Sequence, residues 1–147
     1  YIKKKYSLSI GEQTAETIKI EIGSALATKD QLQFEVRGRD LISGLPKDLI
    51  IRSNEVAEAL TPHLLDIAAS VQNVFNATPP ELVADIMEKG IVLSGGGAQI
   101  RHLDEFFKRM TGVATYLAEE PLFCVAKGAG LILSHLDVYK KTLLNKR

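Results

Sequence analysis

The stretch from Ile91 to Gly112, "IVLSGGGAQIRHLDEFFKRMTG", places three successive glycines between a short apolar run and an amphipathic segment. The apolar run Ile91–Leu93 predicts a short buried strand. The segment from about Gln99 to Met110 predicts a helix whose buried face carries Ile100, Leu103, Phe106 and Phe107. Three residues without side chains in the connection between a strand and a helix indicate either unusual backbone angles or the close approach of another group to the backbone.

Two interpretations of Gly95, Gly96 and Gly97 follow from these residues. The first is a tight turn that binds nothing. The second is a nucleotide lying flat against bare backbone, with amides at the start of the helix facing its polar groups. The sequence contains neither G-x-G-x-x-G nor G-x-x-x-x-G-K-[ST]. The local pattern by itself therefore leaves both interpretations open.

Composition restricts the class of protein. A chain of 147 residues suits one domain, or two small lobes that share a continuous core. Hydrophobic content of 46% and charged content of 24% are typical of a soluble globular protein. A formal net charge of zero argues against a nucleic-acid binder that neutralises phosphates. The opening "YIKKKY" has the character of a helix tail, so we expect the chain to be a fragment.

Neither a metal site nor a catalytic centre is expected. His63, His102 and His135 lie in separate segments without ligand-like spacing, which argues against a zinc site or a Cys/His nucleophile pair. The single cysteine, Cys124, lies in the apolar stretch "LFCVAKGAGLIL" and is expected to be a buried small residue rather than a reactive thiol.

The first third of the chain predicts a helix followed by a small antiparallel sheet. Between Gln13 and Ala25, the helix would bury one face, and Glu16 and Lys19 would lie three residues apart on the other, where they can pair. The segments "LQFEVRGRDL" and "PKDLIIRS" read as strands separated by Gly and Pro. The buried helix face is expected to carry Ala15, Ile18, Ile22 and Ala25.

A second helix is predicted from Asn54 to about Asn76, capped by Ser53 or Asn54, with Pro62 marking a kink or a division. Its apolar face is expected to carry Val56, Leu60, Leu64, Ile67, Val71 and Val74.

A third helix is predicted with Thr78 as N-cap, Pro79 as its first residue, Glu81 as the capping-box acid and Gly90 at its end. Beyond the glycines and their helix, "VATYLA" predicts another short strand, and a last helix is expected from near Leu122 to at least His135. Helices and strands thus alternate in this part of the chain, which is typical of an α/β layer structure.

Three stretches of the sequence resemble the MreB family of bacterial actin-like proteins. They are "YSLSIGEQTAETIKIEIGSA", "FEVRGRDLISGLPKDLIIRSNEVAEAL" and "GIVLSGGGAQIRHLDEFFKRMTGVATYLAEEPLFCVAKGAG", in the family's order and together spanning almost the whole chain. The resemblance implies half of a ribonuclease H-like, actin-type ATPase of the α/β class. It implies a small α+β outer lobe over Tyr1–Asn54 and most of an inner α/β lobe over residues 55–147.

The resemblance also implies an adenosine site. The glycine segment of the family contacts the adenosine side of the nucleotide, which corresponds here to Gly95, Gly96 and Gly97, with Ala98 at the edge. An acidic and a basic residue on the overlying helix contact ribose and adenine, which corresponds to Glu16 and Lys19, with Gly23 close by. From the residues alone, Glu16 and Lys19 read as a solvated salt bridge; the resemblance favours the binding role.

What the resemblance implies for function is an ATP-binding filament protein that organises cell-wall synthesis and rod cell shape, with Mg²⁺ in the complete protein. The implied partners are a second copy, head to tail, the membrane shape protein RodZ and the cell-wall elongation machinery. The implied location is the cytoplasm, with membrane association as part of a filament. The chain contains no D-x-G-x-G phosphate loop, so we expect it to be inactive as an ATPase by itself.

Two alternatives remain at this stage. One is a protein-interaction module whose nucleotide site does not function. The other is a fragment of another actin-superfamily ATPase, such as a heat-shock chaperone or a cell-division actin homologue.

Overall fold

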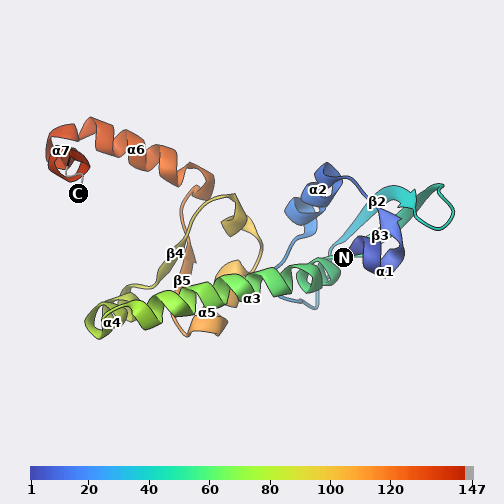
Figure 1. The fold of residues 1–147 in the computed structure, drawn as a ribbon, viewed down its shortest axis with the longest axis horizontal. Coiled ribbons are helices and arrows are strands. Elements are labelled where there is room, and N and C mark those ends of the chain that lie inside the picture. The colour runs from blue at the N-terminus through green and yellow to red at the C-terminus, as the bar shows by residue number, and fades with distance from the viewer. Residues whose placement is uncertain (145–147) are drawn as a thin grey trace.

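One long helix connects two small sheets in the computed structural model, which describes residues 1–144 (Figure 1). This helix, α3 (Ser53–Ala77), runs along one side of the molecule. An antiparallel sheet near its start contains β1 (Leu8–Ser9), β2 (Gln33–Asp40) and β3 (Pro46–Arg52). A parallel pair farther along contains β4 (Ile91–Leu93) and β5 (Thr115–Leu117). The other α-helices are α1 (Ile2–Tyr6), α2 (Glu12–Ile22), α4 (Pro80–Lys89), α5 (Leu103–Thr111), α6 (Cys124–Ser134) and α7 (Leu136–Leu144).

The predicted antiparallel strands are confirmed by the β2–β3 hairpin. Phe34 lies opposite Ile51, and Val36 lies opposite Leu49. Strand β1, which the sequence pattern did not reveal, pairs with the other edge of β2 and contributes the fully buried Leu8. The core cluster at this end comprises Leu8, Ile18, Ile22, Val36, Ile51 and Val56.

Helix α2 confirms the first predicted helix but ends earlier than expected. It stops at Ile22, and Gly23 has an extended backbone with ψ of 137°. Ile18 and Ile22 are buried as expected. Ala15, which was expected on the buried face, is exposed because it lies at the rim of a groove rather than under a neighbouring element.

Helix α3 is a single helix through Pro62, so the predicted division does not occur. Its cap also differs from the expectation, because the side chains of Ser53 and Asn54 accept hydrogen bonds from another segment. The Leu32 amide donates to Ser53 Oγ at 3.2 Å, and the Thr28 amide donates to Asn54 Oδ1 at 3.0 Å. These bonds tie the loop before β2 to the start of α3.

The buried face of α3 is narrower than predicted. Leu64 and Ala68 are buried, but Ile67 is 50% and Val74 is 62% exposed. Farther from the first sheet, the helix packs mainly against α5, which covers only part of the apolar stripe.

Thr78 closes α3 instead of opening α4. Its hydroxyl donates to the Val74 carbonyl at 2.7 Å, so it is not the predicted N-cap. Pro79 takes the N-cap position, α4 begins at Pro80, and no side chain caps the helix, Glu81 included. Gly90 ends α4 as expected, with a φ of 87° that favours glycine.

The predicted strand at Ile91–Leu93 is confirmed as β4, but it is not buried. Val92 is 65% exposed, because β4 pairs only with β5 within residues 1–144. The helix expected from about Gln99 begins at Leu103, and a short 3-10 helix (Gly96–Gln99) precedes it. Leu103, Phe106 and Phe107 are buried as predicted, together with Ala25, Leu64 and Ala68, and Ile100 is partly buried against them.

The C-terminal helices project away from the rest of the molecule (Figure 1). The helix expected to run through His135 is interrupted there, between α6 and α7. Cys124 is partly exposed rather than buried, because α6 packs little of its surface against other elements. None of the helices that the structure describes is long and apolar enough to span a membrane. Residues 145–147 of the expected inner lobe lie outside the described part.

Candidate functional site

Gly95 is explained by the backbone conformation of the turn that follows β4. Its φ of 87° and ψ of 172° define a region that residues with a side chain rarely adopt. Its amide donates to the Pro121 carbonyl at 2.8 Å, which fixes the turn against the segment after β5. For this residue, the tight-turn interpretation is sufficient.

Gly96 and Gly97 have no comparable structural explanation. Both are exposed and lie in the 3-10 helix without a positive φ. An added Cβ would meet nothing within 4 Å at Gly97, and only the Leu122 Cδ2 at 3.3 Å at Gly96. Next to them, the side chain of Ala98 is buried, with 7% of the residue exposed. Packing therefore does not explain why the exposed backbone at Gly96 and Gly97 carries no side chains.

The predicted residues on and after α2 differ in exposure. Glu16 and Lys19 are exposed, and no ion pair joins them in the described part of the chain, so the alternative of a salt bridge between them is not observed. Gly23 is buried, and an added Cβ would lie 2.1 Å from the Lys19 carbonyl oxygen. Glycine is required at this position by close approach of the backbone.

The end of α2 lies directly beside the segment that follows the glycines. The Ala25 amide donates to the Arg101 carbonyl at 2.8 Å, and Ser24 forms a parallel bridge with Arg101. The Arg101 Nε donates to the Gly23 carbonyl at 3.1 Å. The structure thereby brings together two of the sequence-predicted regions, which are more than 70 residues apart in the chain.

Sequence reasoning missed Arg101. It lies in "AQIRHL", at the predicted start of a helix, where a charged residue does not by itself indicate a function. Its partners lie in a distant segment, and no local spacing connects the two.

Two grooves lie near these residues. One, of about 400 Å³, is lined by Lys19 of α2 together with apolar residues of α1, β1 and α3. The other, of about 270 Å³, lies under the glycine segment and is lined by Gly97, Ala98 and apolar residues of α3, β4 and α5. Neither of these two grooves is lined by both segments.

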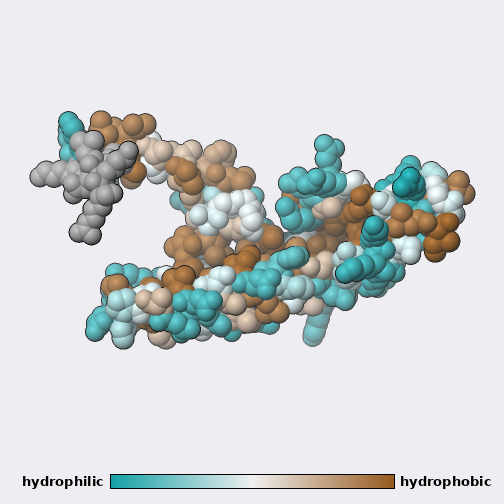
Figure 2. Space-filling model, in the orientation of Figure 1, coloured by the Kyte–Doolittle hydropathy of each residue, from teal (hydrophilic) through white to brown (hydrophobic). Residues whose placement is uncertain are grey.

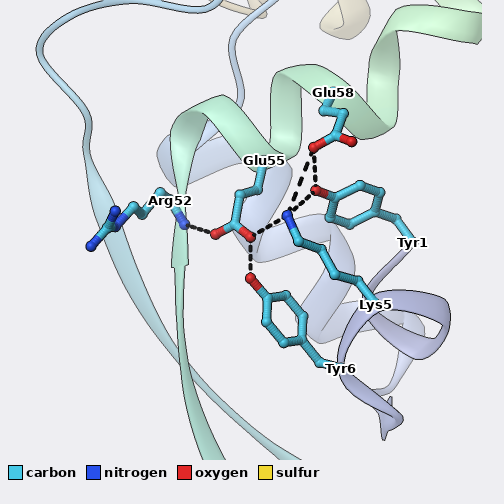
Figure 3. Close-up of polar contacts among 6 residues, drawn as sticks. All are labelled: Tyr1, Lys5, Tyr6, Arg52, Glu55 and Glu58. Carbon is cyan, nitrogen blue, oxygen red and sulfur yellow. Dashed lines mark hydrogen bonds and ion pairs between the residues drawn. The ribbon is translucent and has the colours of Figure 1, made fainter.

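A cluster of polar side chains joins α1 to the start of α3 (Figure 3). The Tyr6 hydroxyl donates to Glu55, and Lys5 Nζ lies 3.0 Å from Glu55 Oε1. The Tyr1 hydroxyl donates to Glu58 Oε2 at 2.5 Å and accepts from Lys5 Nζ at 2.8 Å. Glu55 is the least exposed carboxylate of the cluster, with 15% of its side chain accessible.

Glu55 has a lowered pKa. Partial burial acts to raise it, but hydrogen bonds from the Tyr6 hydroxyl and the Arg52 amide, together with Lys5, outweigh that effect. The unfolded chain therefore binds more protons than the folded chain as Glu55 titrates, so this carboxylate stabilises the fold above its ordinary pKa of 4.5 and ceases to do so below its folded pKa.

We expect Glu55→Gln to reduce the loss of stability on acidification. Because glutamine does not titrate, the free energy of unfolding of the variant should fall less between about pH 5 and pH 3 than that of the parent chain. Urea unfolding at a series of pH values measures this slope. Glu58→Gln is the matched control, since Glu58 is mostly exposed. Equal slopes for the parent chain and Glu55→Gln would contradict the prediction.

No group of three or more His, Cys, Asp or Glu side chains able to hold a metal ion is found among the described residues. The glycine segment offers exposed backbone, and α2 carries an exposed carboxylate, Glu16, and an exposed ammonium group, Lys19. These groups suit recognition of a polar organic ligand more than acid–base or metal chemistry.

Comparison with known proteins identifies the family. A family model described as "MreB/Mbl protein" matches residues 1–141. This chain belongs to the MreB/Mbl family. The resemblance seen in the sequence and the actin-like fold class are thereby confirmed.

Curated members of the MreB/Mbl family are similar over almost the whole chain. The cell shape-determining protein MreB of Escherichia coli K12 is 43% identical over 146 residues, covering 99% of this chain and 42% of that protein. The cell shape-determining protein Mbl of Bacillus subtilis 168 is 40% identical, covering 99% of this chain and 44% of that protein. The chain thus spans less than half the length of these MreB and Mbl proteins.

Solved structures of MreB relatives agree in fold. Spiroplasma citri MreB5 bound to ADP has a TM-score of 0.90 and 36% identity, with 99% of this chain and 44% of that chain covered. The same protein bound to AMPPNP also gives a TM-score of 0.90. A MamK double helical filament has a TM-score of 0.65 at 23% identity over 83% of this chain and 37% of that chain, which shows a shared fold alone.

Proposed function

We propose that this chain forms the adenosine side of the nucleotide site of a filament protein that determines cell shape. The observation that carries this proposal is the exposed, side-chain-free backbone at Gly96 and Gly97, which packing does not require. Relatives that cover the whole of this region are named as cell shape-determining proteins, and MreB5 was crystallised with ADP and with AMPPNP.

The proposed contacts follow from the chemistry of the groups present. The backbone of Gly95–Gly97 offers a flat surface to the adenosine and amide donors to its polar atoms. The Glu16 carboxylate accepts hydrogen bonds from ribose hydroxyl groups, and the Lys19 ammonium donates to acceptor atoms of the nucleotide. Gly23 and Ala98 are both buried, so they contribute to the packing of the two segments rather than to their exposed surface.

We further propose two lobes, an outer one over Tyr1–Asn54 and an inner one over residues 55–147. Two core clusters support a division into two lobes, although Val56 belongs to the first cluster, Ala25 belongs to the second, and Leu60 of α3 packs against both. ATP hydrolysis would require phosphate loops with their Mg²⁺ from another part of a family-length protein, because this chain contains no D-x-G-x-G sequence. Head-to-tail self-association, contacts with a RodZ-like membrane protein and the cell-wall machinery, and a cytoplasmic location at the membrane belong to the same proposal.

A second candidate function is protein interaction without nucleotide binding. Figure 2 shows apolar surface over α6 and near β4 and β5. Val125 is 84%, Leu133 is 71% and Val92 is 65% exposed. Exposed apolar side chains that gather on one surface are typical of a site of protein interaction.

A titration of the purified chain with ADP, followed by amide NMR shifts, separates the two candidates. The nucleotide proposal expects shifts confined to Gly95–Gly97 and to α2 around Glu16 and Lys19, even at millimolar affinity. Shifts absent from both segments at saturating ADP would favour the interaction module for this chain.

The sharpest variant for this proposal is Gly97→Val. The introduced valine side chain has open space around it, so the free energy of unfolding should change by less than about 1 kcal/mol. The Kd for ADP should rise at least about tenfold, or ~1.4 kcal/mol, because the side chain occupies the place of the nucleotide. Gly128→Val on exposed α6 is the matched control, because an added Cβ there also meets nothing within 4 Å. A parallel loss of stability and binding in Gly97→Val would support the tight-turn interpretation instead.

A further inference from the structure

Arg101 occupies the junction between the glycine segment and α5. Toward the glycines, the Ile100 amide donates to the Gly97 carbonyl at 3.3 Å, so the residue before Arg101 closes the 3-10 helix. Toward α5, His102 adopts a left-handed conformation with φ of 59°, and Leu103 enters the core. Arg101 thus lies between an exposed turn and a helix whose apolar face enters the second core cluster.

Two hydrogen bonds attach this junction to the end of α2. The Arg101 carbonyl accepts from the Ala25 amide, and the Arg101 Nε donates to the Gly23 carbonyl. Beside them, Ser24 Oγ lies 3.1 Å from His102 Nδ1, and Ser24 is 2% exposed. The end of α2, which carries Glu16 and Lys19, is therefore joined to this junction by two hydrogen bonds of Arg101 and by the contact of Ser24 with His102.

We propose that Arg101 is a positioning residue that sets the distance between α2 and the glycine segment, and so the width of the nucleotide site. This inference rests on the proposed function for its ligand. Arg101 itself need not touch the nucleotide, because its side chain acts through the Gly23 carbonyl. The position of the Gly23 carbonyl also depends on glycine, since an added Cβ would lie 2.1 Å from the Lys19 carbonyl oxygen and force the backbone to move.

The hydrogen bonding of the guanidinium group indicates a local role rather than a large contribution to overall stability. Arg101 Nη2 is buried and has no hydrogen-bond partner among the described residues. A buried donor without an acceptor is destabilising, which offsets part of what the Nε bond contributes. Removing the guanidinium while keeping an unbranched apolar side chain should therefore leave global stability nearly unchanged and loosen only the junction.

Arg101→Met tests this inference in the full 147-residue chain. We expect faster amide hydrogen exchange at Gly23 and Gly95–Gly97, with unchanged exchange in the β2–β3 hairpin and a nearly unchanged unfolding midpoint. The Kd for ADP should rise about fivefold or more. Lys108→Met is the matched control, because Lys108 is an exposed cation on α5 and loses the same charge. Arg101→Lys, a second variant, retains the charge but not the Nε geometry and should show the same local pattern to a smaller extent.

Three outcomes decide the matter. Local loosening with weaker ADP binding supports the inference. Unchanged exchange at the junction overturns the inference, because Arg101 then has no positioning role there. A uniform rise in exchange across the chain also overturns it, because Arg101 then acts on global stability. If the parent chain fails to bind ADP, the proposed nucleotide site fails for this chain, whereas the exchange pattern of Arg101→Met still decides whether Arg101 positions the two segments.

Discussion

Phe106→Ala should lower the free energy of unfolding by about 3–5 kcal/mol. The Phe106 side chain is 6% exposed and lies in the core cluster formed with α3, where its ring packs edge-to-face against Phe107 at 5.4 Å between centroids. Its removal leaves a cavity where α5 packs against α3. Urea unfolding followed by far-UV circular dichroism measures the change.

The matched control for this prediction is Phe123→Ala. Phe123 precedes α6 and is 55% exposed, so the same truncation should cost less than about 1 kcal/mol. Similar losses for the two variants would mean that the second core cluster contributes little to cooperative unfolding, contrary to our expectation. A large loss for Phe106→Ala alone would establish this cluster as the main source of stability beyond the first sheet.

Gly23→Ala should disturb both the fold and the proposed site. The new Cβ would lie 2.1 Å from the Lys19 carbonyl oxygen, so the backbone at the end of α2 has to move. We expect a loss of about 1–3 kcal/mol in the free energy of unfolding, as for overpacked sites. The shift moves the Gly23 carbonyl away from Arg101, so the Kd for ADP should rise more than about tenfold, or ~1.4 kcal/mol.

Gly130→Ala provides the control of opposite sign. Gly130 lies inside α6, and an added Cβ meets nothing within 4 Å. Alanine is favoured over glycine in a helix by about 0.5–1 kcal/mol, so this variant should be slightly more stable and bind ADP as before. A Gly23→Ala chain with parental stability and affinity would show that the end of α2 adjusts freely, and it would also weaken the role assigned to Arg101.

The proposed site depends on two segments that are anchored in different core clusters. Helix α2 is anchored by Ile18 and Ile22 in the first core cluster, and α5 is anchored by Leu103 in the second. Between these anchors lie the exposed glycines and the junction at Arg101. A ligand that contacts both segments therefore bridges the two core clusters. We expect its affinity to depend on the contacts at the Arg101 junction that join them.

Local patterns predicted most of the elements. The alternation in "LQFEVRGRDL" predicted β2, the three- and four-residue spacing predicted α2 and α3, and Gly90 marked the end of α4. Strand β1 was missed, since two residues are too short to show a period. The caps at Ser53, Asn54 and Thr78 were wrong for a different reason. The side chains of Ser53 and Asn54 accept from amides of a distant segment, whose positions only the folded chain reveals, whereas Thr78 bonds to the carbonyl four residues before it and so ends α3.

By itself, the sequence determined the order of most elements and the identity of the glycine segment, because these follow from residue types at fixed spacing, and its resemblance to MreB proteins indicated the family. The tertiary structure decided which glycine has which role. Gly95 is required by its φ and Gly23 by the Lys19 carbonyl, whereas Gly97 is sterically free. It also decided that Arg101 joins α2 to the glycines. The physical reason is that steric demand and hydrogen-bond partners depend on atoms far away in sequence, which no local pattern encodes.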